Sequence, residues 1–174
     1  SEEERLRREV KRVEDENRKL LERLREIAER VHRENKRLLD ESRRIADKVR
    51  RDLDRLPKTE ELKKLIDDLR RSLEELERRN RKVDKEIKDR LKRVEEENRK
   101  VDKELKDRVK EFEDRKEPLE EVLEELERVL KRLEEEHRRV VKELRDLLRR
   151  IKEDHDRLVE EAEEILREID ERAK

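Results

Sequence analysis

Apolar residues recur along the whole chain at alternating intervals of three and four, as in the run Leu6, Val10 and Val13. This spacing is typical of an α-helix that buries one face. The rows are interrupted only near the two prolines, so the pattern predicts three long helices. Each would be about 80 Å long at the rise of an α-helix. The predicted helices cover residues 2–56, 60–115 and 118–173.

Pro57 and Pro118 mark the predicted loops, at residues 57–59 and 116–117. Proline disfavours helical geometry in the residue before it and is accepted at the start of a helix. Thr59 is placed to cap the second helix. The three long helices predict an all-α fold. Short loops between consecutive helices force them to pack antiparallel. We expect an elongated, antiparallel up-down-up three-helix bundle, coiled-coil-like with nearly straight helices, forming a single domain over residues 1–174.

Six polar residues occupy positions in the apolar rows where a hydrophobic residue is expected. Within each helix the two polar positions are separated by 18 residues, which is about five helical turns, so they lie on the same face. The surrounding sequence also repeats, since Asn80-Arg-Lys-Val returns as Asn98-Arg-Lys-Val. The six residues are Asn17, Asn35, Asn80, Asn98, His137 and His155.

In an antiparallel hairpin, the numbers of facing residues add to a constant. Asn17 and Asn98 give the same total as Asn35 and Asn80, and the midpoint falls at the first proline loop. In the second hairpin, Asn98 and His137 give the same total as Asn80 and His155, and the midpoint falls at the second proline loop. The sequence therefore predicts two buried, hydrogen-bonded layers about 27 Å apart. The layers are Asn17/Asn98/His137 and Asn35/Asn80/His155.

A buried amide without a partner costs about 1–3 kcal/mol, so the members of a layer must satisfy one another. Such layers add little net stability but penalise wrong registers and wrong helix partners. The alternative is that each polar residue is isolated and points partly to solvent. Ser42 and Ser72 are candidates for a minor polar layer, although Ser42 bonding the carbonyl one turn back is equally compatible. His32 lies off the inward row and is expected to be a solvated flank residue.

Composition narrows the functional classes. Charged residues make up 64% of the chain, the net charge is −1, and Gly and Cys are absent. Thiolate chemistry and a glycine-rich phosphate loop are therefore excluded. The 55 basic residues are interleaved with 56 acidic ones, so no basic stripe that could bind nucleic acid is expected. We also expect no membrane-spanning segment and no membrane-binding face.

We also expect no catalytic residue, no metal and no cofactor. No serine or threonine has an apparent His–carboxylate partner in a cleft, and one imidazole with two amides is a poor zinc site.

The glycine-free Glu/Lys/Arg/Leu composition, the connections RLPKTEEL and RKEPLEEV, and the repeated Asn/His layers resemble de novo designed helical bundles with buried hydrogen-bond networks. The resemblance covers the whole chain. It implies an idealised scaffold or assembly component without an evolved activity or native location, expressed in soluble form in a host cytoplasm.

Two functions follow from the sequence. The first is a monomeric structural scaffold that requires no partner. The alternative is a protein–protein interaction module, domain-swapped or part of a hetero-oligomeric bundle, and pH-responsive through its buried histidines. If those histidines are buried uncharged, stability is expected to decline as the pH drops below about 6.5. An isolated charged helix or long coiled coil would require both prolines to be mere kinks.

Overall fold

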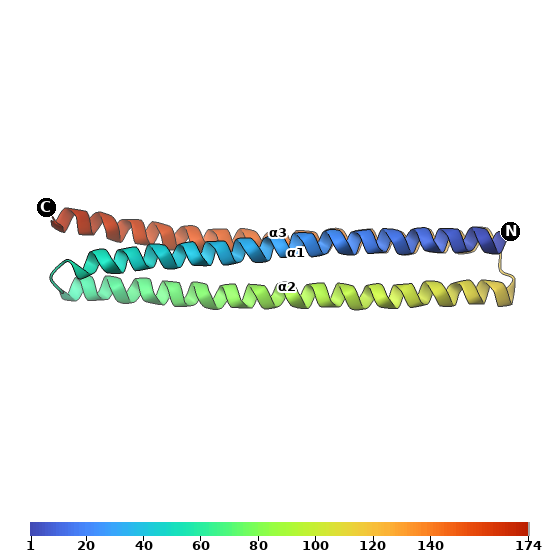
Figure 1. Ribbon diagram of the computed structural model, residues 1–174, viewed down its shortest axis with the longest axis horizontal. Helices are drawn as coiled ribbons and strands as arrows, with labels where there is room; N and C mark the ends of the chain where they lie inside the picture. Colours follow the sequence, from blue (N-terminus) through green and yellow to red (C-terminus); the bar gives the residue numbers. More distant parts are fainter. Residues whose placement is uncertain (174) are drawn as a thin grey trace. The chain divides into compact units, whose positions relative to one another are not determined.

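The computed structural model describes residues 1–173, which form three α-helices packed against one another (Figure 1). Helix α1 covers Glu2–Asp54, α2 covers Glu60–Arg115 and α3 covers Leu119–Ala173. The predicted fold class, an all-α three-helix bundle, is confirmed. Within residues 1–173, no helix combines the length and apolar composition that crossing a membrane requires.

The chain divides into two compact units, and each contains a piece of all three helices. The first unit combines Ser1–Glu29 with Ile87–Leu144, and the second combines Arg30–Glu86 with the chain from Arg145 on. The first unit therefore holds the α2–α3 loop, and the second holds the α1–α2 loop. The expectation of a single domain stays a prediction, and the two units are described separately below.

Helix α1 begins as the sequence predicts and ends slightly earlier. The hydroxyl of Ser1 accepts a hydrogen bond from the backbone N–H of Glu4 at 3.3 Å, which is a helix N-cap. The predicted end at residue 56 was wrong, because the helix stops at Asp54. The backbone N–H of Leu56 donates to the carbonyl three residues back at 3.1 Å, which tightens the last turn. Pro57 explains this, since it excludes helical geometry at the residue before it.

The two ends of α2 show how a chain without glycine caps a helix. At its start, the Thr59 hydroxyl accepts from the backbone N–H of Leu62 at 3.3 Å. At its end, Lys116 has φ of 50°, in the left-handed region, and its N–H donates to the carbonyl of Phe112 at 3.1 Å. This is the usual C-terminal helix cap, in which glycine normally occupies the left-handed position. Helix α3 begins one residue after Pro118, rather than at it as predicted.

The first unit is an antiparallel bundle, as its cross-helix ion pairs show. Arg5 and Arg12 of α1 contact Glu120 and Glu127 of α3, so these helices run in the same direction. The number of the α1 residue rises as its α2 partner falls, from Arg7–Glu113 to Arg25–Glu95. The core of this unit comprises Leu6, Val10, Val13, Val101, Leu105, Phe112, Leu119, Val122, Leu126, Leu130 and Leu133. Burial of one such large side chain contributes about 1.5–3 kcal/mol.

Arg108 holds the α2–α3 turn of the first unit together. Its guanidinium donates to Glu117 in the loop and to Glu125 of α3, the latter at 2.8 Å. These hydrogen bonds raise the pKa of Arg108 above its ordinary value, with Glu117 as the larger cause, and lower the pKa of Glu117. The contacts fix where α3 starts relative to α2.

The second unit has the same antiparallel order. Arg43 of α1 contacts Glu77 of α2 at 3.0 Å, and Arg79 of α2 contacts Asp154 of α3 at 3.0 Å. Its core comprises Ala46, Val49, Leu53, Leu62, Leu69, Leu76, Leu158, Ala162, Ile165 and Ile169. No large apolar side chain is exposed among the described residues of either unit. The apolar rows of the sequence are thus the faces that the helices bury.

Candidate functional site

Asn35 of α1 and Asn80 of α2 form a reciprocal pair in the core of the second unit. Each residue is only 2% exposed. The Asn35 side-chain amide donates to the backbone carbonyl of Asn80 at 3.1 Å, and the Asn80 amide donates to the carbonyl of Asn35 at 3.4 Å. Each side chain therefore recognises the main chain of the other helix. Sliding one helix along the other would break both bonds.

Asp84 and His32 extend this pair towards the surface. Asp84 Oδ1 accepts from the Asn35 amide at 3.0 Å and lies 2.9 Å from His32 Nδ1. His32 lies on the flank of the helix with 43% of its side chain exposed, as predicted, but the sequence did not indicate its contact with Asp84. A sequence signal existed, because Asp84 follows Asn80 by one helical turn and His32 precedes Asn35 by about one turn. We call these four residues, His32, Asn35, Asn80 and Asp84, the second-unit network.

The orientation of both amides in this pair is fixed by their partners. Each NH₂ group donates to a carbonyl, which can only accept, so neither amide can be flipped without losing that bond. The remaining amide oxygens of Asn35 and Asn80 are buried without a hydrogen-bond donor. A buried acceptor left in this state costs about 1–3 kcal/mol. The two hydrogen bonds of the pair are thus offset in part by two unsatisfied acceptors.

His155 does not join the two asparagines. Its Nδ1 lies 2.7 Å from the hydroxyl of Ser42, and its Nε2 lies 3.8 Å from Glu41. The predicted Asn35/Asn80/His155 layer therefore does not form as a single hydrogen-bonded set. The reason is that α3 is shifted along α1, since His155 contacts Ser42, about two helical turns beyond Asn35. The equal totals in the sequence gave the pairing of α1 and α2 correctly, but not the offset of α3.

The Ser42 hydroxyl resolves the donor and acceptor roles at this contact. Ser42 Oγ also lies 2.9 Å from the carbonyl of Leu38, one turn back, and only the hydroxyl can donate there. The Ser42 oxygen then accepts from His155 Nδ1–H, which leaves Nε2 directed at Glu41. Of the two possibilities that the sequence left open, the bond from Ser42 to the carbonyl one turn back is confirmed, and the pair of Ser42 with Ser72 does not form. Ser72 instead donates to Glu161 of α3 at 2.8 Å.

Ser42, His155 and Glu41 together contain the groups of a hydrolytic triad, which the sequence did not indicate. The expectation concerned a serine in a cleft, and Ser42 is in the core. Nucleophilic catalysis nevertheless needs a hydroxyl that can reach a substrate. Ser42 is 0% exposed, and its hydrogen is directed at a main-chain carbonyl. The contact is therefore suited to holding the histidine ring in place, and not to attack on a substrate.

The corresponding positions of the first unit are not bonded in this way. Asn17 and Asn98 are 3% and 8% exposed, and His137 is half-buried. Within residues 1–173, none of these three side chains makes a hydrogen bond, so the predicted first layer is not a hydrogen-bonded set. Burial lowers the pKa of His137 first, and the nearby charge of Arg23 lowers it further.

Two substitutions within the repeat account for this difference. Glu14 stands 18 residues before His32, and Asp102 stands 18 residues after Asp84. The first unit thus has two carboxylates where the second has an imidazole and a carboxylate. Burial raises the pKa of Glu14, and the charge of Asp102 raises it further. One oxygen of Asp102 is buried without a hydrogen-bond donor.

The second substitution concerns the histidine. Leu24 stands 18 residues before Ser42, so the hydroxyl that meets His155 in the second unit has no equivalent near His137. The second unit therefore contains both partners, His32 and Ser42, and the first unit contains neither. The 18-residue repeat is nearly perfect in its apolar row. It differs at the positions that decide whether the buried polar groups find hydrogen-bond partners.

Among the described residues, no group of three or more His, Cys, Asp or Glu side chains is arranged to hold a metal ion. Comparison with protein-family models, curated proteins and solved structures gave no match.

Proposed function

We propose that this chain is a structural scaffold of designed type, whose specified property is the register of its helices and which carries no catalytic activity. The observation that carries the proposal is the reciprocal Asn35–Asn80 pair, in which each amide donates to the main chain of the other helix. Asp84 and His32 hold the Asn35 amide in the required orientation.

The energetics of the pair fit a role in specificity. The two bonds offset the cost of burying the amide donors, but the two amide oxygens remain without donors. Replacing such a group by apolar side chains of similar size is often neutral or stabilising. A polar group at an inward position is retained where it fixes register or partner choice. The pair is therefore most useful against competing registers.

The test is to replace both asparagines by leucine, as Asn35→Leu with Asn80→Leu. We expect the denaturant midpoint to rise, by the equivalent of about 1–3 kcal/mol, while the helices lose their single register. The chain has no cysteine, so spin labels can be attached at Lys36→Cys and Arg78→Cys. Electron–electron distance measurements between the labels should give one narrow peak for the parent and several for the variant. A slip of one turn displaces a residue by about 5.4 Å.

The matched control is Asn17→Leu with Asn98→Leu in the first unit, where the asparagines are buried but not hydrogen-bonded. This variant should gain stability and keep the narrow distance peak of the second unit. The proposal fails if the second-unit variant also keeps one narrow peak, because the reciprocal bonds would then not determine the register.

The alternative proposal is an interaction or assembly module. Two closely similar polar repeats allow one helix to be exchanged between chains, which would double the mass. Against it, the described residues expose no large apolar side chain on which a partner could dock. Light scattering across a range of concentrations separates the two. A constant mass of one chain supports the scaffold, and a mass of two chains supports helix exchange.

A further inference from the structure

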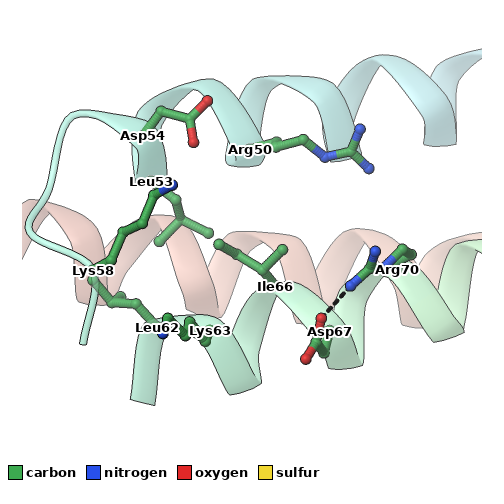
Figure 2. A pocket seen from close by; sticks show the side chains of 9 residues that line it. All are labelled: Arg50, Leu53, Asp54, Lys58, Leu62, Lys63, Ile66, Asp67 and Arg70. Carbon is green, nitrogen blue, oxygen red and sulfur yellow. Dashed lines mark hydrogen bonds and ion pairs between the residues drawn. The ribbon is translucent and has the colours of Figure 1, made fainter. Parts of the chain in front are cut away.

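A cavity of about 530 Å³ lies in the second unit, where α1 ends and α2 begins (Figure 2). Ligand sites in proteins commonly have volumes of about 300–1,000 Å³, so this cavity is large enough for a small molecule. Other cavities in the described part of the chain include ones of about 310, 300 and 230 Å³. The lining of the cavity at the α1–α2 turn combines apolar and basic side chains.

The floor of this cavity is apolar. It is formed by Leu53 of α1 and by Leu62 and Ile66 of α2. Figure 2 shows Leu53 and Ile66 projecting into the space between the two helices. Leu53 and Leu62 are only 3% and 4% exposed, so the partly exposed Ile66 offers most of the apolar surface of the floor. An alkyl chain lying against Ile66 would remove this surface from water, which is the main favourable term in binding a hydrophobic ligand.

The rim of the cavity is cationic. Four basic side chains line it, and two acidic ones, Asp54 and Asp67, accompany them. Asp67 is paired with Arg70, which is itself a rim residue, and Asp54 carries the second negative charge of the rim (Figure 2). The basic rim residues are Arg50, Lys58, Lys63 and Arg70.

Three of the rim cations, Arg50, Lys58 and Lys63, are open to a further anion, whereas Arg70 is held by Asp67. Arg50 and Lys63 contact carboxylates only along their own helices, at 3.9 and 3.5 Å, with about half of each side chain exposed. Exposed pairs of this kind are weak and exchange partners easily. Lys58, in the loop, has no carboxylate within ion-pair distance among residues 1–173. A ligand with a negative head group would therefore gain charge contacts without first breaking a strong pair.

From this floor and rim we propose that the cavity binds a single-chain amphipathic anion, with its alkyl chain on Leu53, Leu62 and Ile66 and its carboxylate or sulfate among the rim cations. The two parts of the ligand are both required. A small inorganic anion would not use the apolar floor, and an amphiphile with a cationic head would be repelled by the rim. The proposal does not depend on the role of the asparagine pair.

The test is a titration with decanoate, followed through the ¹³C-labelled methyl groups of the leucine, isoleucine and valine residues. The methyl signals of Leu53, Leu62 and Ile66 should shift, whereas those of Val101 and Leu105 in the first unit should not. The matched probe is decyltrimethylammonium, which has the same chain length and the opposite charge. We expect it to bind at least tenfold more weakly. Equal binding of the two probes, or shifts spread evenly over both units, would overturn the proposal.

Charge reversal at the rim gives an independent measurement. Arg50→Glu with Lys58→Glu should weaken decanoate binding about fivefold to tenfold, because two exposed cations are lost and two anions gained. Lys36→Glu, an exposed position of the same unit away from the cavity, is the control and should leave binding unchanged. Ile66→Phe should also weaken binding by filling the floor. If inorganic sulfate competes as well as decanoate does, the site is a simple anion site and the amphiphile proposal is wrong.

Discussion

Replacing Glu14 by histidine should repair the polar contact that the first unit lacks. In the second unit, His32 Nδ1 lies 2.9 Å from Asp84 Oδ1, and this oxygen also accepts from Asn35. Glu14 occupies the repeat position of His32, and Asp102 occupies that of Asp84. The variant Glu14→His therefore places a hydrogen-bond donor where a second carboxylate now stands.

The expected gain is about 1 kcal/mol. A hydrogen bond to a charged group contributes about 1.5–3 kcal/mol, and removal of a like charge at close range adds a few tenths. The exposure of the template pair reduces this figure, since 43% of the His32 side chain and 35% of the Asp84 side chain are exposed. Solvent screening thus lowers the free energy that this hydrogen bond contributes. The buried Asp102 oxygen nevertheless gains a donor that it lacks.

The assay is equilibrium unfolding in urea at pH 7, with the midpoint and slope compared between variant and parent. Because the two units need not unfold together, amide hydrogen exchange should be followed separately in each. We expect the midpoint to rise and the added protection to be confined to the first unit. Protection that rises in the second unit instead would show that the repeat correspondence is wrong.

Two further variants separate the donor from the lost repulsion. Glu14→Ala removes the carboxylate without supplying a donor, so it should gain less than Glu14→His. In the background of Asp102→Ala, the advantage of histidine over alanine at position 14 should disappear. The reasoning is refuted if the alanine and histidine variants are equally stable, or if the advantage survives the loss of Asp102.

Two other predictions concern a helix end and a histidine. Lys116→Gly should stabilise the chain by about 0.5–1 kcal/mol, because Lys116 has φ of 50° and glycine carries no Cβ to oppose that geometry. The control is Lys116→Ala, which keeps the Cβ and should give no gain in the urea midpoint. Burial and Arg23 lower the pKa of His137 in the folded chain, so the unfolded chain binds a proton at a higher pH than the folded chain does. The contribution of His137 to the free energy of unfolding should therefore decline as the pH falls below about 6.5 and level off beneath the folded pKa. The loss of midpoint between pH 7.5 and 5.5 should then be larger for the parent than for His137→Asn, and equal losses would exclude His137 as the cause.

The sequence by itself determined the three helices, their antiparallel order and the contact of α1 with α2 at Asn35 and Asn80. Apolar intervals of three and four residues fix the buried face of a helix, because that spacing matches the helical turn. Pro57 and Pro118 fix the connections within two residues, since proline acts through its own ring and its immediate neighbour. The contact between Asn35 and Asn80 also followed from numbering alone, because a short loop leaves an antiparallel pair few registers to adopt.

Only the tertiary structure decided which polar groups meet across three helices. His155 contacts Ser42 and Glu41 in place of the asparagines, because this contact depends on where α3 lies along α1 within the second unit. The roles of His32 and Asp84 were hidden for a related reason, since they lie beside the inward row and meet only when α1 and α2 are packed. Hydrogen bonds need distances near 3 Å, whereas apolar packing tolerates looser placement. A periodic pattern can therefore specify a core without specifying its polar contacts.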